Sequence, residues 1–145
     1  MLTGPVTRTE IETSLPAWHD EIAAASVDTE AARALADVPP GAEVVVFLGT
    51  WCGDSRRVIS RLFVALEEVP APPFSLELIA VDRSKRDPDG RADGRDIRFV
   101  PTIIVMRDGA EVGRIVESAP HGVESDLLAL LRGEASGTIS LRTDL

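Results

Sequence analysis

The feature that most constrains this chain is the run Glu43–Leu48, where one glutamate is followed by three valines, a phenylalanine and a leucine. A continuous apolar run of this length, rich in β-branched residues, is typical of a parallel strand buried on both faces of a sheet. A parallel strand needs a crossover segment before its partner strand, and that segment is usually a helix. After a loop over 49–54, the sequence predicts such a helix, ending before Pro70, because apolar residues recur at helical spacing at Val58, Ile59, Leu62, Phe63 and Leu66.

The rest of the chain predicts a second strand, a hairpin and a closing helix. These elements are Phe74–Val81, the hairpin strands Thr102–Arg107 and Ala110–Glu117, and the helix Val123–Leu131. Asp108 and Gly109 supply the turn of the hairpin, and we expect the polar segment Arg83–Arg98 to be a loop or a short helix. The order of elements predicts an α/β fold with a central mixed sheet, built from a βαβ unit and an antiparallel ββα unit and flanked by helices.

We expect three parts along the chain. They are an N-terminal helical extension over 1–42 that packs on the domain, one domain over 43–135, and a C-terminal tail over 136–145. Residues 1–10 are polar and contain glycine and proline, so we expect them to be frayed. We expect the chain after Gly133 to be loose.

Charge and composition argue against several classes of function. The chain has 145 residues and a net charge of −9, and no segment offers the concentrated basic face that nucleic acid requires. No apolar run approaches the roughly 18 to 20 residues that span a bilayer, and there is no secretory signal, so we expect a cytoplasmic protein without a membrane partner. His19 and His121 are isolated in the sequence, so we expect no metal site and no cofactor.

The candidate reactive residue is Cys52, the single cysteine in the chain. It follows a predicted strand and begins a predicted helix, where unpaired backbone N–H groups and the positive end of the helix dipole favour a thiolate over a thiol. Arg56 and Arg57 add positive charge one turn along the helix. Asp54 opposes them, and we expect it to act as a carboxylate at the helix N-terminus rather than as a catalytic acid.

Two segments resemble the thioredoxin superfamily: VVVFLGTWCGDS with the helix after it, and FVPTIIVMRDGAEVGRIVE with the closing helix. Trp51, Cys52, Gly53 and Pro101 follow the thioredoxin pattern. The resemblance implies that the bond between Val100 and Pro101 is cis and that this proline faces the cysteine. It also implies that Val100 offers its backbone groups to an extended peptide or to glutathione, a form of strand addition. Trp51 either flanks the site or simply packs against the domain.

Three positions depart from the thioredoxin pattern. Ser55 replaces the resolving cysteine, Asp54 replaces the usual proline, and Val46 stands where thioredoxins bury an aspartate. Cys52 can therefore attack a disulfide, but only an outside thiol can release the mixed disulfide that forms. We expect the Ser55 hydroxyl to donate a hydrogen bond to the Cys52 thiolate.

These residues predict a monothiol thioredoxin-like protein that performs thiol–disulfide exchange, with Cys52 and Ser55 as the catalytic residues. The expected partners are protein disulfides or a low-molecular-weight thiol such as glutathione, together with an external reducing thiol. The residues expected to bind the substrate are Trp51, Gly53, Asp54, Val100 and Pro101.

Two alternatives remain open. The first is a non-catalytic binding module that holds an extended partner between the Trp51 loop and Val100–Pro101. The second follows from the likeness of CGDS to the Cys-Gly-x-Ser loop of monothiol glutaredoxins, whose cysteine can ligate an iron–sulfur cluster with glutathione. Trp51 and the absence of an upstream lysine argue against the second. A peroxiredoxin is disfavoured because Thr50 stands two residues before Cys52, not three.

Overall fold

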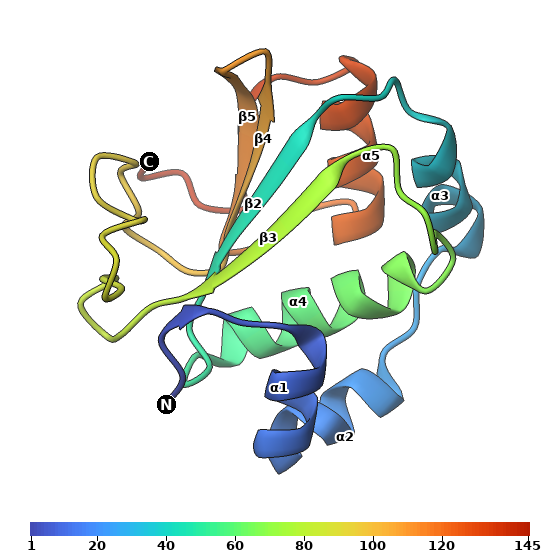
Figure 1. The fold of residues 1–145 in the computed structure, drawn as a ribbon. Helices are drawn as coiled ribbons and strands as arrows, with labels where there is room; N and C mark the ends of the chain where they lie inside the picture. Colours follow the sequence, from blue (N-terminus) through green and yellow to red (C-terminus); the bar gives the residue numbers. More distant parts are fainter.

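The computed structural model describes residues 1–145, and six strands form one mixed sheet in the order β1-β3-β2-β4-β5-β6 (Figure 1). At its centre, β2 (Glu43–Leu48) runs parallel to β3 (Ser75–Ala80) and antiparallel to β4 (Thr102–Arg107). The crossover between the parallel strands contains α4 (Gly53–Leu66), and β4 continues into the antiparallel strand β5 (Ala110–Val116). The predicted βαβ unit, hairpin and mixed sheet are therefore confirmed.

The remaining helices pack with α4 against one face of the sheet, where they form the larger of two cores (Figure 1). They are α1 (Arg8–Ser14), α2 (Pro16–Ala24), α3 (Thr29–Ala34), the short 3-10 helix Leu35–Asp37 and α5 (Val123–Arg132). None of the helices is long and apolar enough to cross a membrane.

Strand β2 is buried on both faces, as predicted, but different segments of the chain pack against the two faces. Val44 and Val46 point to the core beneath the helices. Val45 and Phe47 belong to a smaller cluster that also includes Ala92, from the segment after β3. That segment, yellow in Figure 1, consists of turns without a helix. One face of the sheet is thus covered by helices and the other by a turn-rich loop.

The expectation that residues 1–10 are frayed is wrong. Gly4 and Pro5 form the short strand β1, which pairs antiparallel with the end of β3, and α1 begins soon after at Arg8. The Val6 N–H then donates to the Leu78 carbonyl over 3.0 Å. Glycine and proline in a polar segment favour disorder, but an edge strand accepts a proline because the side facing away from the sheet needs no N–H donor.

The expectation of a loose tail is also wrong for part of that segment. Residues Gly137–Ile139 form β6, which pairs parallel with β5. The approach is so close that a Cβ atom at Gly113 would lie 2.5 Å from the Gly137 carbonyl oxygen. A three-residue strand has too short a pattern to be detected in the sequence.

Candidate functional site

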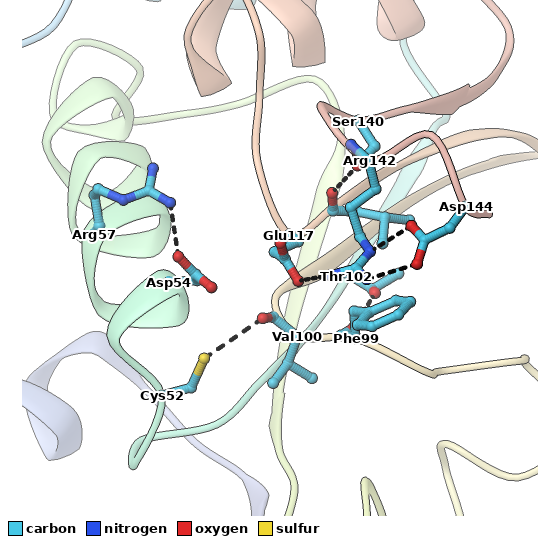
Figure 2. A network of polar contacts seen from close by, with 11 residues as sticks. Cys52, Asp54, Arg57, Phe99, Val100, Thr102, Glu117, Ser140, Arg142 and Asp144 are labelled. Atoms are coloured by element: carbon cyan, nitrogen blue, oxygen red, sulfur yellow. Dashed lines mark hydrogen bonds and ion pairs between the residues drawn. The ribbon is translucent and has the colours of Figure 1, made fainter.

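Cys52 lies at the N-cap of α4 and is partly exposed. Its Sγ is 3.5 Å from the carbonyl oxygen of Val100, to which the thiol donates (Figure 2). The peptide bond between Val100 and Pro101 is cis, as the resemblance implied, and Val100 is buried. The fold therefore brings together the two predicted site segments, which are 48 residues apart in the sequence.

The loop before Cys52 is shaped by the packing of Trp51. The indole Nε1–H donates to the Val81 carbonyl at the end of β3 over 3.0 Å. The ring also lies against Gly49, where a Cβ atom would be only 2.6 Å from the indole Cε2. Trp51 thus has a structural role, which was one of its two expected roles, and it also lies directly beside the cysteine.

The N-terminal extension also holds this loop, a contact that sequence reasoning missed. The indole of Trp18, which is 1% exposed, donates to the Thr50 carbonyl over 3.0 Å. The backbone N–H of Leu2 donates to the Thr50 hydroxyl over 3.2 Å. The one available signal was a large apolar residue, Trp18, within the predicted helical extension, which indicates burial but not the partner.

Ser55 has a different partner from the one we expected. It is fully buried, and its hydroxyl oxygen accepts a hydrogen bond from the Gly49 N–H over 3.1 Å. No hydrogen bond joins Ser55 to Cys52. The reason is geometric: Ser55 lies in the first turn of α4 on the side facing the core, so its hydroxyl meets the backbone that leaves β2.

The charged residues at the start of α4 are paired within the chain. Asp54 and Arg57 form an ion pair of 2.9 Å on the exposed side of the helix (Figure 2). Arg56 lies 3.4 Å from Glu21 of α2. Neither arginine is therefore free of carboxylate partners, and Asp54 lies in the first helical turn, where a carboxylate is favourable.

The surroundings of Cys52 contain no buried acid at the position marked by the resemblance. Val46 is fully buried in the larger core, among aliphatic side chains. The structure contains no group of three or more His, Cys, Asp or Glu side chains that could hold a metal ion. Gly53, next to Cys52, is exposed, and nothing lies within 4 Å of where its Cβ would be. The approach to the start of α4 is therefore open.

A second network, also missed in the sequence, lies beyond Phe99 in the loop that precedes the cis proline. The Arg142 guanidinium lies 3.8 Å from the centroid of the Phe99 ring and pairs with Glu117 at 3.0 Å and Asp144 at 2.7 Å (Figure 2). The hydrogen bond from Arg142 lowers the pKa of Asp144 below its usual range, against a smaller opposing effect of desolvation. The C-terminal segment is thus attached at Phe99, and the residue after Phe99, Val100, faces Cys52.

No model of a protein family matches the sequence, and no curated protein sequence matches it. Among solved structures, a Pseudomonas aeruginosa protein of unknown function has a TM-score of 0.65 and 17% identity, and the match covers 91% of this chain and 94% of the other. An HIV epitope scaffold gives the same values. Thioredoxin from Fasciola hepatica matches with a TM-score of 0.45 and 22% identity, over 65% of this chain and 80% of its own.

At these identities the comparisons concern the fold and not the activity. The sheet has a parallel pair joined by α4, an antiparallel hairpin, and a closing helix after the hairpin. The single cysteine lies at the carboxyl end of the central strand, opposite a cis proline. The chain has a thioredoxin-like α/β fold.

Proposed function

We propose that the protein performs monothiol thiol–disulfide exchange through Cys52. The observation that supports this most directly is the position of the partly exposed Sγ, at the N-cap of α4 and 3.5 Å from the Val100 carbonyl. A thiolate is the nucleophile in such exchange, and a partly exposed sulfur can be reached by a partner disulfide. Trp51, Gly53, Val100 and Pro101 form the surroundings of that sulfur.

The reaction has two balanced steps. The Cys52 thiolate attacks one sulfur of a partner disulfide, which forms a mixed disulfide with Cys52 and releases the other sulfur as a thiolate. An external thiolate then attacks the partner sulfur of the mixed disulfide, takes over the disulfide bond and restores Cys52. The chain cannot perform the second step alone, because it has no other cysteine.

A direct test uses intact mass spectrometry under native conditions. The reduced protein is incubated with glutathione disulfide, and we expect one adduct of a single glutathione, which added thiol removes. Cys52→Ser is the matched control and forms no adduct. If the wild-type protein forms an adduct only after it is unfolded, the sulfur is inaccessible and the proposal is wrong.

A second candidate is a binding module with the same fold and no chemistry. The observation that favours it is that no buried acid lies at position 46 and that Ser55 does not bond to the sulfur, since Val46 is aliphatic and the Ser55 hydroxyl accepts from Gly49. The two candidates differ in what Cys52→Ala does. A binding module keeps its partner after this substitution, whereas thiol exchange loses all covalent capture.

A further inference from the structure

Four cations of this acidic chain lack a carboxylate partner and lie in one loop. Most arginines form ion pairs, and Arg107 instead donates to three backbone carbonyls. The exceptions are Arg83, Lys85, Arg86 and Arg95, for which no ion pair is present. All four follow β3, in the loop that covers the second face of the sheet. In the sequence the cationic residues of this loop are interleaved with five aspartates between positions 82 and 96.

The structure shows that acidic side chains of this loop bind the backbone instead. Asp82 accepts hydrogen bonds from the N–H groups of Ser84 at 2.8 Å and Arg86 at 3.1 Å. The turn that results includes Lys85 at a positive φ of 61°. Both bonds go to the Oδ1 atom of Asp82, and the cationic side chains of the turn, Arg83, Lys85 and Arg86, form no ion pair with Asp82 or with another carboxylate.

Two of these cations lie over the indole next to Cys52. The Arg83 Cζ is 5.0 Å from the Trp51 ring centroid, and the Lys85 Nζ is 5.7 Å from it. A guanidinium or ammonium in this position is attracted to the electron-rich face of the ring. Arg83 donates no side-chain hydrogen bond in the structure, and Lys85 donates one, to the Arg83 carbonyl at 3.4 Å.

We infer that Arg83 and Lys85, held over Trp51, form a carboxylate-binding subsite for an acidic polypeptide whose disulfide Cys52 attacks. This inference rests on the proposed function. Free guanidinium donors match a carboxylate, and charge complementarity orients a partner on a protein whose surface otherwise repels acids.

The occupant is a polypeptide because it has to contact two segments, the loop after β3 that carries both cations and the start of α4 that carries the sulfur. The Trp51 indole extends toward Val81, whereas the Cys52 Sγ faces Val100. An acidic residue a few positions along an extended chain has the reach, at about 3.3 Å per residue.

The test measures capture of short cysteine peptides activated as 2-thiopyridyl mixed disulfides. Cys52 attacks the peptide sulfur, the peptide becomes bound to Cys52, and 2-thiopyridone is released after proton uptake and monitored by absorbance. Three peptides differ only at the three residues on each side of cysteine, which are all Glu, all Gln or all Lys. At low salt we expect the Glu peptide to react roughly three- to tenfold faster than the Gln peptide, the Lys peptide to react slowest, and the differences to shrink at 1 M salt.

The variant Arg83→Gln/Lys85→Gln should bring the Glu peptide to the rate of the Gln peptide and leave the Gln peptide unchanged. Arg86→Gln is the matched control, because it removes a charge from the same turn without a contact to Trp51, and it should keep the preference. Equal rates for the Glu and Gln peptides on the unaltered protein overturn this inference but leave the proposed function intact.

Two further outcomes distinguish a wrong polypeptide assignment from a failure of the proposed function. Glutathione activated in the same way should react equally with the unaltered protein and with the double variant. If the double variant slows glutathione as much as it slows the Glu peptide, the subsite serves a small thiol and the polypeptide assignment is wrong. If no activated disulfide reacts with the native protein, the proposed function fails, and this inference fails with it.

Discussion

The two ends of the chain both reach the candidate site, but they are attached by different forces. The N-terminal extension contributes Ile11 and Trp18 to the larger core, at 0% and 1% exposure, and Trp18 also donates to Thr50. The C-terminal segment is attached through β6 and through the ion pairs of Arg142, which remain partly exposed. The first attachment is mainly apolar burial, and the second is mainly charge and backbone pairing.

The difference shows which end of the chain can respond to its surroundings. Apolar burial depends little on salt and pH, whereas exposed ion pairs weaken as the ionic strength rises or as a carboxylate is protonated. The N-terminal extension is therefore an integral part of the domain. The tail is the part that can separate from the Phe99 loop while the rest of the fold persists.

The largest expected effect is that of Trp18→Ala. We expect it to lower the free energy of unfolding by about 3–5 kcal/mol, because a fully buried aromatic side chain is lost and a cavity remains. Urea denaturation measures this. The control Trp18→Phe retains most of the buried volume but loses the hydrogen bond to Thr50, so it should cost clearly less. A loss below about 1 kcal/mol for Trp18→Ala would contradict an integral N-terminal extension.

The second effect concerns the attachment of β6. Gly113→Ala should cost about 1–3 kcal/mol, because the new methyl group would collide with the backbone of Gly137. The same substitution should cost less in a chain that lacks residues 137–145, because the Gly137 backbone is then absent and only the end of the Leu130 side chain, 2.7 Å from the new Cβ atom, has to shift. Equal costs in the two chains would show that β6 does not restrict position 113.

The third effect is on the attachment of the tail in acid. The pKa of Asp144 is lower in the folded protein than in the unfolded chain. The ionised carboxylate therefore stabilises the folded state fully at pH values above its unfolded pKa of about 3.9. This stabilisation is lost as the pH falls through the lower pKa that Asp144 has in the folded protein. We expect β6 amides to exchange hydrogen faster below about pH 4, while β2 amides stay protected. In Arg142→Ala the β6 amides should no longer exchange faster on going below about pH 4. If that acceleration persists, the ion pair between Arg142 and Asp144 is not its cause.

The smallest effect is that of salt at neutral pH. Raising the ionic strength from 0.05 to about 1 M shortens the screening length to roughly 3 Å, so the pairs of Arg142 with Glu117 and Asp144 should weaken. Limited proteolysis of residues 140–145 should become modestly faster, with no change at the N-terminal extension. The measurement needs a protease that is itself insensitive to salt. Equal acceleration at both ends would remove the contrast between them.

The central part of the fold could be predicted because its signals are long and periodic. The run Glu43–Leu48, the helical spacing after it and the Asp108-Gly109 turn each determine a local structure, and the structure contains all three. The closeness of Cys52 and Val100 came from the resemblance, since no local pattern links positions 48 residues apart.

Other features depend on tertiary contacts that the sequence does not display. Strands β1 and β6 are too short to show a period, and they exist because neighbouring strands offer free backbone groups. The direction of the Ser55 hydroxyl depends on how the first turn of α4 meets β2. In the loop after β3, the sequence shows alternating charges, but only the structure shows that Asp82 is bonded to backbone amides while Arg83 lies over Trp51.

The segments nearest the two termini supply both outer strands of the sheet, β1 on β3 and β6 on β5. Unpaired outer strands are templates on which a second molecule can add. Proteolytic trimming or a fusion tag that displaces either segment would therefore favour self-association, even in a sample whose cysteine is fully reduced.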